Sequence, residues 1–182
     1  MIEINKQEFT SKLTKIFGAN GLSSYLSMEI NEKFYNLTVR MLEENEKYNL
    51  TAITDIDKII LNHYADCVAM AAKLKKGANI VDVGCGAGFP ALVVGAFDTS
   101  LEVTALDSTK KKVDFVSICA KEANLFNVKG ICARAEECGF REDFDIVLSR
   151  GVARLNVLSE LCLPLVKLGG SFIAMKGSAG EE

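Results

Sequence analysis

The sequence has little of the chemistry on which metal centres depend. Its 182 residues include one histidine, His63, and its six cysteines form no Cys-x-x-Cys pair. The cysteines are therefore expected to be reduced and mostly buried, as is usual in a reducing compartment. We predict that this chain binds no metal.

Long apolar runs and a strong excess of one charge are also absent. The longest apolar stretch, residues 89–97, has nine residues, whereas a membrane-spanning helix needs about 20. The sequence therefore predicts a cytoplasmic protein that has no signal peptide and does not contact a membrane. A net charge of −3 provides no overall attraction for nucleic acid, which would have to bind a local patch.

The length and the hydrophobic content of 49% suit one domain with a single core. Apolar residues recur at helical spacing in residues 9–17 and again in residues 30–41. We therefore predict a helical cap over residues 1–76, with Asp55 as the N-cap of its last helix. Residues 77–182 form the core, and the whole chain is expected to be one structural unit and a monomer.

Strand and helix patterns alternate from residue 77 onward, which predicts an α/β fold with a mainly parallel sheet. The strands are expected at residues 80–83, 102–106, 128–132, 144–148 and 171–175. The helices between them are expected at residues 90–97, 110–124 and 152–167, with a short turn at 135–138. In such a sheet a ligand lies beyond the carboxyl ends of the strands, beside the first strand.

The rest of the chain is organised around the segment NIVDVGCGAGFP, where a strand reaches three alternate glycines, Gly84, Gly86 and Gly88, just after Asp82. Glycine permits positive φ values and lets a ligand lie directly against the main chain. We expect this loop to cradle a ligand. The following helix is expected to point its N-terminal N–H groups at that ligand.

The glycine spacing distinguishes between possible ligands. The dinucleotide motif G-x-G-x-x-G requires glycine at position 89, which is Phe89 here, and no Lys-Ser or Lys-Thr follows a glycine as a phosphate loop requires. The pattern D-x-G-x-G-x-G instead resembles the first motif of class I S-adenosylmethionine-dependent methyltransferases. A plain strand-to-helix connection is the alternative.

Candidate ligand contacts follow the second and third strands. Asp107 lies 23 residues after Gly84, a separation at which a carboxylate meets the two hydroxyls of a ribose. Ala135 and Glu136 follow the third strand, where an adenine ring would pack. For each of these residues an ordinary surface position is the alternative.

Basic residues follow the later strands, with Arg150 and Arg154 after the fourth and Lys176 after the fifth. Lys110–Lys112 open a helix, where the macrodipole disfavours cations, so a patch that contacts phosphate is one interpretation. A solvated helix start is the other. His63 is either a positioning residue or a hydrogen-bonded structural histidine.

Seven segments together resemble the RsmG family, also called GidB or glucose-inhibited division protein B. In chain order they are YNLTAIT, DVGCGAGFP, LDSTKKK, RAEE, SRGVARL, LCLPLVKLGG and MKG. The resemblance implies a Rossmann-like class I methyltransferase that uses S-adenosylmethionine to methylate N7 of a guanine in 16S rRNA near the decoding centre. It implies 16S rRNA or the small ribosomal subunit as the partner.

The resemblance also assigns residues by position. It places cofactor contacts at Gly84, Phe89, Ala135, Glu136 and Arg150, and we add Asp82, Gly86, Gly88 and Asp107 to this predicted set. The polar positions that match the family are His63, Asn49, Arg154 and Lys176, and we predict a positioning role for Arg150, Arg154, Lys176 and His63. The antiparallel hairpin that usually completes the sheet of this class is expected to be missing, since the sequence stops at Glu182.

Guanine N7 carries a lone pair and no proton, so its attack on a sulfonium methyl group needs no general base, and no catalytic residue is assigned. Neither the N-P-P-Y motif of amino-group methylation nor the Pro-Cys pair of pyrimidine C5 methylation follows the fourth strand. Two alternatives stay open: a non-catalytic module that binds an adenosyl ligand or RNA, and a small-molecule methyltransferase. A dehydrogenase is the least favoured.

Overall fold

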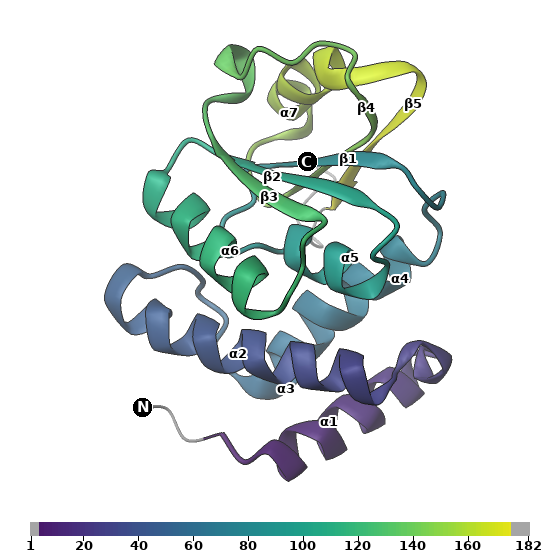
Figure 1. Ribbon diagram of the computed structural model, residues 1–182, viewed down its shortest axis with the longest axis vertical. Coiled ribbons are helices and arrows are strands. Elements are labelled where there is room, and N and C mark those ends of the chain that lie inside the picture. Colours follow the sequence, from purple (N-terminus) through teal and green to yellow (C-terminus); the bar gives the residue numbers. More distant parts are fainter. Residues whose placement is uncertain (1–3, 176–182) are drawn as a thin grey trace.

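The computed structural model describes residues 4–175. The N-terminal part is helical (Figure 1). Its elements are α1 (Lys6–Ala19), a short turn (Ser23–Tyr25), α2 (Met28–Tyr48), α3 (Ile56–Ile59), a π-helical turn (Ile60–Ala65) and α4 (Asp66–Ala71). Helix α3, the π-helical turn and α4 follow one another without a break and form one continuous helix whose middle part is π-helical.

Local sequence explains where these helices begin and which face they bury. The Asp55 carboxylate accepts a hydrogen bond from Lys58 N at 2.9 Å, so the predicted N-cap is confirmed. The apolar face predicted for the first helix is also confirmed, because Phe9, Leu13 and Phe17 are buried in the core. None of the helices within residues 4–175 is both long and apolar enough to cross a membrane.

Within residues 4–175 the sheet has five parallel strands in the order β3-β2-β1-β4-β5, which confirms the predicted α/β class. The strands are β1 (Asn79–Val83), β2 (Glu102–Asp107), β3 (Val128–Cys132), β4 (Phe144–Arg150) and β5 (Val166–Met175). Since all five run in the same direction, their carboxyl ends share one edge of the sheet, and chain order reverses beside β1.

Helices cover the two faces of the sheet unequally (Figure 1). The connecting helices are α5 (Ala91–Phe97), α6 (Lys110–Glu122) and α7 (Leu155–Cys162), with short turns at Ala135–Glu137 and Leu163–Leu165. Helices α5 and α6 cover one face together with the N-terminal helices, whereas α7 lies over the other face. The core is divided accordingly into a large cluster and a smaller one.

The last strand differs from the prediction. It begins at Val166 rather than Ser171, because Val166 already pairs with Phe144 and the register then shifts so that Ser171 pairs with Ile146. The intervening residues 167–170 bulge out of the ladder, with Gly169 at φ 81°. The helix expected over residues 152–167 is therefore shorter than predicted.

Aromatic rings join the helical part to the core. The rings of Phe34 on α2 and Tyr64 in the π-helical turn stack at 4.3 Å, and the Tyr64 hydroxyl lies 2.7 Å from Thr38 Oγ1. Tyr64 in turn meets Phe89 of the glycine-rich loop edge-on at 5.7 Å. The N-terminal helices therefore pack against the loop that precedes α5, and both belong to the large core cluster.

Candidate active site

A cleft of about 450 Å³ lies at the carboxyl ends of β1 to β4. Its volume lies within the range of small-molecule sites. Its walls carry loop glycines, polar groups and a few apolar side chains. The residues that line it are Val83, Gly84, Gly86, Leu106, Asp107, Ser108, Thr109, Lys112, Ala133, Arg134, Ala135, Glu136, Arg150, Gly151, Val152 and Leu161.

Hydrogen bonds within the protein hold the glycine-rich loop. Gly84 N and Cys85 N both donate to the Leu106 carbonyl, at 2.8 and 3.0 Å. At the start of α5, Ala91 N donates to Asp82 Oδ2 at 3.0 Å. This corrects the expectation that the helix points its N-terminal N–H groups at a ligand, because Asp82 takes up that donor. The loop is therefore preformed, and the site does not resemble a pyrophosphate site.

The three loop glycines differ in what a side chain at each position would contact. Gly86 has φ 54°, and a Cβ there would meet no described atom closer than 3.9 Å, so this position is open. A Cβ at Gly84 would lie 2.3 Å from Val152 Cγ2, and one at Gly88 would lie 2.4 Å from Leu92 Cδ1. Gly84 and Gly86 line the cleft. Gly88 is not among the described residues that line the cleft; it allows the loop to contact α5 closely behind the cleft wall.

The two predicted acidic residues have different surroundings. Asp82 is fully buried and does not line the cleft formed by the described residues, and burial raises the pKa of its carboxyl to about 7. Asp107 does line the cleft, and its two oxygens accept from Thr109 N at 2.8 Å and Gly86 N at 3.1 Å. These bonds fix the Asp107 carboxylate at the cleft wall. Each of its oxygens retains a further lone pair for a ligand.

Arg150 at the end of β4 connects the cleft with the helical part. Its Nη1 donates to the Asn62 carbonyl at 2.7 Å, and its Nη2 lies 2.7 Å from His63 Nδ1. Because a guanidinium has only donors, His63 Nδ1 must accept, and the ring proton must sit on Nε2, which lies 3.5 Å from Thr51 Oγ1. The His63 ring is therefore a neutral acceptor that holds Arg150.

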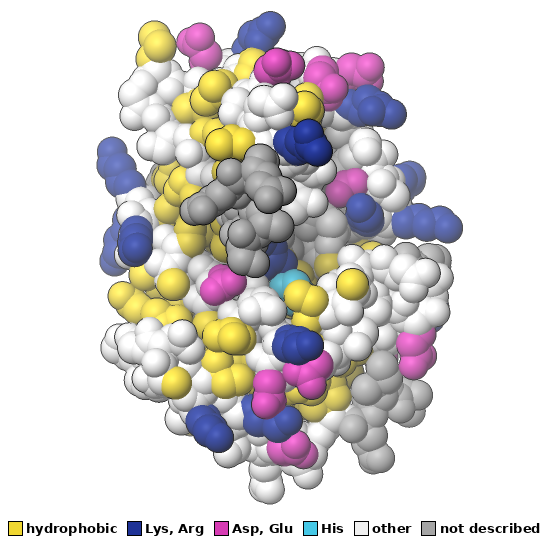
Figure 2. Space-filling view, turned by 180° about the vertical axis from the view of Figure 1, so that it is seen from behind, with side chains coloured by type: hydrophobic (Ala, Val, Ile, Leu, Met, Phe, Trp, Pro, Cys, Tyr) yellow, Lys and Arg dark blue, Asp and Glu magenta, His cyan; other side chains and the backbone are white. Residues whose placement is uncertain are grey.

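The electrostatics of His63 agree with this tautomer. Burial, followed by the positive charge of Arg150, lowers the pKa of His63 to about 4. Its ring stacks on Phe89 at 4.5 Å, with 11° between the planes, and the Arg150 guanidinium lies 5.8 Å from the centre of the same Phe89 ring. His63 is 5% exposed, and on the face drawn in Figure 2 only a small patch of histidine, in cyan, reaches the surface. Phe89 is thus buried behind the cleft wall, where it supports His63 and Arg150.

The structure brings some of the predicted residues together and not others. Those at the cleft are Gly84, Gly86, Asp107, Ala135, Glu136 and Arg150. Arg154 is the exposed N-cap residue of α7, and Asn49 is an exposed residue that caps the end of α2 with φ 50°; neither is among the described lining residues. Lys176 lies outside the described residues.

Sequence reasoning missed several residues of the cleft walls, among them Val152 and Thr109. Val152, two residues after β4, closes over Gly84, and Thr109 donates its N–H to Asp107. Val152 lies in a loop that follows a strand end, and such loops are a general indication of a ligand site. No spacing rule, however, predicts the contact between Val152 and Gly84. Among residues 4–175, no cluster of three His, Cys, Asp or Glu side chains could hold a metal ion.

The chain matches the family described as GidB, rRNA small subunit methyltransferase G, over residues 30–182. It belongs to this family. A ribosomal RNA small subunit methyltransferase G of Oceanobacillus iheyensis is 45% identical over 163 residues, which cover 86% of this chain and 68% of that protein. The Bacillus cytotoxicus protein of the same name is 43% identical over 185 residues, covering 98% and 75%.

Solved structures support the fold of this methyltransferase G family member. Coclaurine N-methyltransferase bound to N-methylheliamine and SAH superposes with a TM-score of 0.56 at 17% identity, over 93% of this chain and 58% of that chain. At this identity the likeness shows the fold, which is the Rossmann-like fold of class I methyltransferases. The chain spans 58% of the length of that neighbour.

The residues at the cleft fit S-adenosylmethionine, the methyl donor of this class. The open Gly86 position gives main chain without a side chain in the way, and the fixed Asp107 carboxylate can accept from two hydroxyls. Ala135 and Glu136 form the wall beyond β3, and Glu136 is exposed. The cleft therefore offers a diol acceptor and bare main chain, two features that suit an adenosyl ligand.

Proposed function

We propose that this protein transfers the methyl group of S-adenosylmethionine to N7 of a guanine in 16S rRNA, acting in the cytoplasm on the RNA or on the small ribosomal subunit. The observation that carries the proposal is the cleft at the carboxyl ends of the strands, where Gly86 is open and Asp107 is fixed. Membership of the methyltransferase G family supports the RNA substrate.

The residues of the cleft divide the work of binding. Asp107 would accept from the ribose hydroxyls, and Ala135 and Glu136 would flank the adenine. Gly84 and Gly86 would let the methionine part lie against the loop. S-adenosylmethionine supplies an electrophilic methyl group on a positively charged sulfur.

The protein's part in the transfer is to position groups rather than to move a proton. Guanine N7 attacks through a lone pair, so no side chain has to act as a base. His63 is not available as one, because its Nδ1 already accepts from Arg150 and its Nε2 carries the ring proton. We assign Arg150 the role of a positioning residue that shapes the cleft wall and is itself held by His63 and Asn62.

Transfer of a tritiated methyl group from S-adenosylmethionine to small ribosomal subunits that lack their methyl groups tests the proposal. We expect tritium in 16S rRNA, at a single guanine that becomes sensitive to cleavage at N7-methylated positions. Label in a pool of small metabolites but not in RNA would favour the small-molecule alternative. Binding of the donor without transfer to either would favour the non-catalytic module.

A further inference from the structure

A second groove, of about 420 Å³, lies at the opposite edge of the sheet, beside the amino ends of β1, β4 and β5. Five of its lining residues are charged, namely Lys73, Lys75, Lys76, Lys167 and Asp145. We call it the lysine groove. Four lysines against one aspartate give a local excess of three positive charges on a protein whose net charge is −3. The cleft at the other edge has three cations against two anions, an excess of only one.

The fold keeps most of this charge at the surface. Asp145 is already engaged, because it accepts from Asn79 N at 2.8 Å and from Lys167 Nζ at 3.1 Å, and these bonds lower the pKa of its carboxyl. Lys167 stands in the bulge of β5 that the register shift lifts out of the ladder. The three other lysines are exposed in the turn that leads from α4 to β1. Lys73, Lys75 and Lys76 therefore present cations at the surface of the groove, whereas Lys167 is paired with Asp145.

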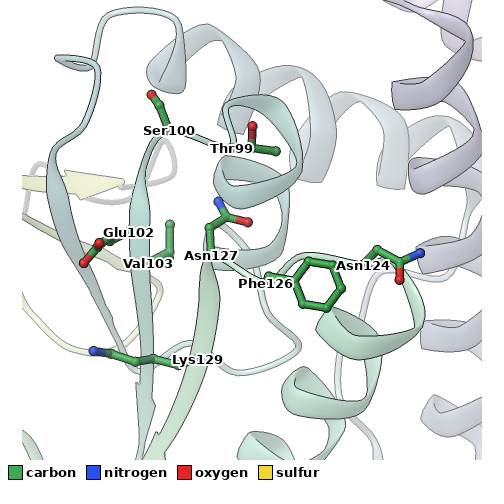
Figure 3. A pocket seen from close by; sticks show the side chains of 8 residues that line it. All are labelled: Thr99, Ser100, Glu102, Val103, Asn124, Phe126, Asn127 and Lys129. Atoms are coloured by element: carbon green, nitrogen blue, oxygen red, sulfur yellow. The ribbon is translucent and has the colours of Figure 1, made fainter.

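The lysine groove adjoins a hollow with different chemistry, shown in Figure 3. Gly77 lines the groove and donates its N–H to Ser100 Oγ at 3.3 Å, and Ser100 lines the hollow. The hollow also holds Thr99, Asn124 and Phe126, together with one carboxylate, Glu102, and one further lysine, Lys129, whose charges balance; the Phe126 side chain is 91% exposed. Cations, hydroxyl and amide groups and a free aromatic ring thus follow one another along the amino edge of the sheet.

We propose that this edge binds a single-stranded segment of the RNA substrate, with phosphates in the lysine groove and a base stacked on Phe126. Lysines that follow the backbone next to an exposed aromatic ring are the combination by which proteins bind single strands. The proposal rests on the proposed function. The two edges are separated by the length of β1, five residues or about 17 Å, which a large folded RNA spans.

The test compares two triple variants of the full chain. The groove variant is Lys73→Gln, Lys75→Gln and Lys76→Gln. The matched control removes three exposed lysines from α1, α3 and α6, through Lys15→Gln, Lys58→Gln and Lys121→Gln. Both lower the net charge equally, so a difference between them reports position rather than total charge. The affinity for S-adenosylmethionine, measured by calorimetry, checks that each variant is folded.

For the groove variant we expect the KM for small-subunit RNA to rise about tenfold, with kcat and the donor affinity unchanged. The dependence of log K on log salt should become shallower by about 2, since each lost phosphate contact to a single strand removes about 0.7. Phe126→Ala should weaken RNA binding about tenfold with little change in that slope. The control should leave all of these quantities near the wild-type values.

Three results would overturn the proposal. One is a groove variant with the wild-type KM and salt slope. Another is an equal loss in the control variant, which would point to total charge. The third is a loss on assembled subunits but not on naked RNA, which would point to a ribosomal protein as the partner. The proposed function would stand in each case, because it fails only if the wild-type protein itself transfers no methyl group to RNA.

Discussion

Acidification should destabilise this protein through His63. The imidazole has a pKa of 6.5 when free and about 4 in the folded protein, where burial and Arg150 disfavour its charged form. Between these values the unfolded chain binds a proton that the folded chain does not, so the free energy of unfolding falls as the pH falls from 6.5 to 4. At about 1.4 kcal/mol for each unit of pKa, His63 contributes a loss of about 3 kcal/mol.

The variant His63→Gln isolates this effect, because its side-chain oxygen can still accept from Arg150 but does not titrate. The free energy of unfolding should be measured by urea denaturation of both proteins between pH 4 and 8. Asp82 opposes His63 in both: burial raises the pKa of its carboxyl from 3.8 to about 7, so its contribution to stability declines as the pH rises over that interval. The difference between the two proteins removes the Asp82 contribution.

We expect the difference in stability to be constant above pH 7 and to change by about 3 kcal/mol in favour of the variant toward pH 4. Titration of the His63 ring protons by NMR gives the same quantity directly and should place its pKa well below 6. Parallel stability curves, or a His63 ring that titrates near 6.5, would refute the reasoning. In that case Arg150 would not be held by a neutral imidazole.

Three further predictions concern the loop and the cleft. Gly86→Val should remove binding of S-adenosylmethionine, measured by calorimetry, because the new side chain enters the open cleft; since φ is 54° there, the substitution also strains the backbone, so circular dichroism has to show that the chain is folded, and unchanged affinity would contradict the assignment. Gly88→Ala should lower the free energy of unfolding by about 1–3 kcal/mol, because its Cβ would collide with Leu92, and equal stability in urea would be the contrary result. Arg150→Ala should slow methyl transfer about 100-fold, and turnover at the wild-type rate on undermethylated subunits would show that the cleft does not need it.

The sequence predicts those parts of the fold that depend on neighbouring residues. The alternation of strands and helices, the N-cap Asp55 and the break at the loop glycines all follow local rules, and the structure agrees with them. The start of β5 does not follow such a rule. Residues 167–170 read as the end of a helix and a turn, whereas the pairing of Val166 with Phe144 makes them a bulge, and that pairing depends on a partner more than 20 residues away.

At the candidate site, too, local sequence patterns predict some features, whereas contacts between distant residues determine others. Spacing alone placed Asp107 and Glu136 at the carboxyl edge, since every parallel strand ends there. Spacing could not distinguish Gly86, which is open, from Gly88, which is required by Leu92. Nor could it predict that Arg150 reaches the helical part, because the contact with His63 joins residues 87 positions apart. Contacts between distant segments determine these roles.

The most direct test of the central claim is a crystal structure of the protein soaked with S-adenosylhomocysteine, the demethylated product of the donor. The account predicts the product in the cleft, with its ribose against Asp107, its adenine beside Ala135 and its amino-acid part along Gly86. Density for the product at any other place, or an empty cleft at saturating concentration, would contradict it.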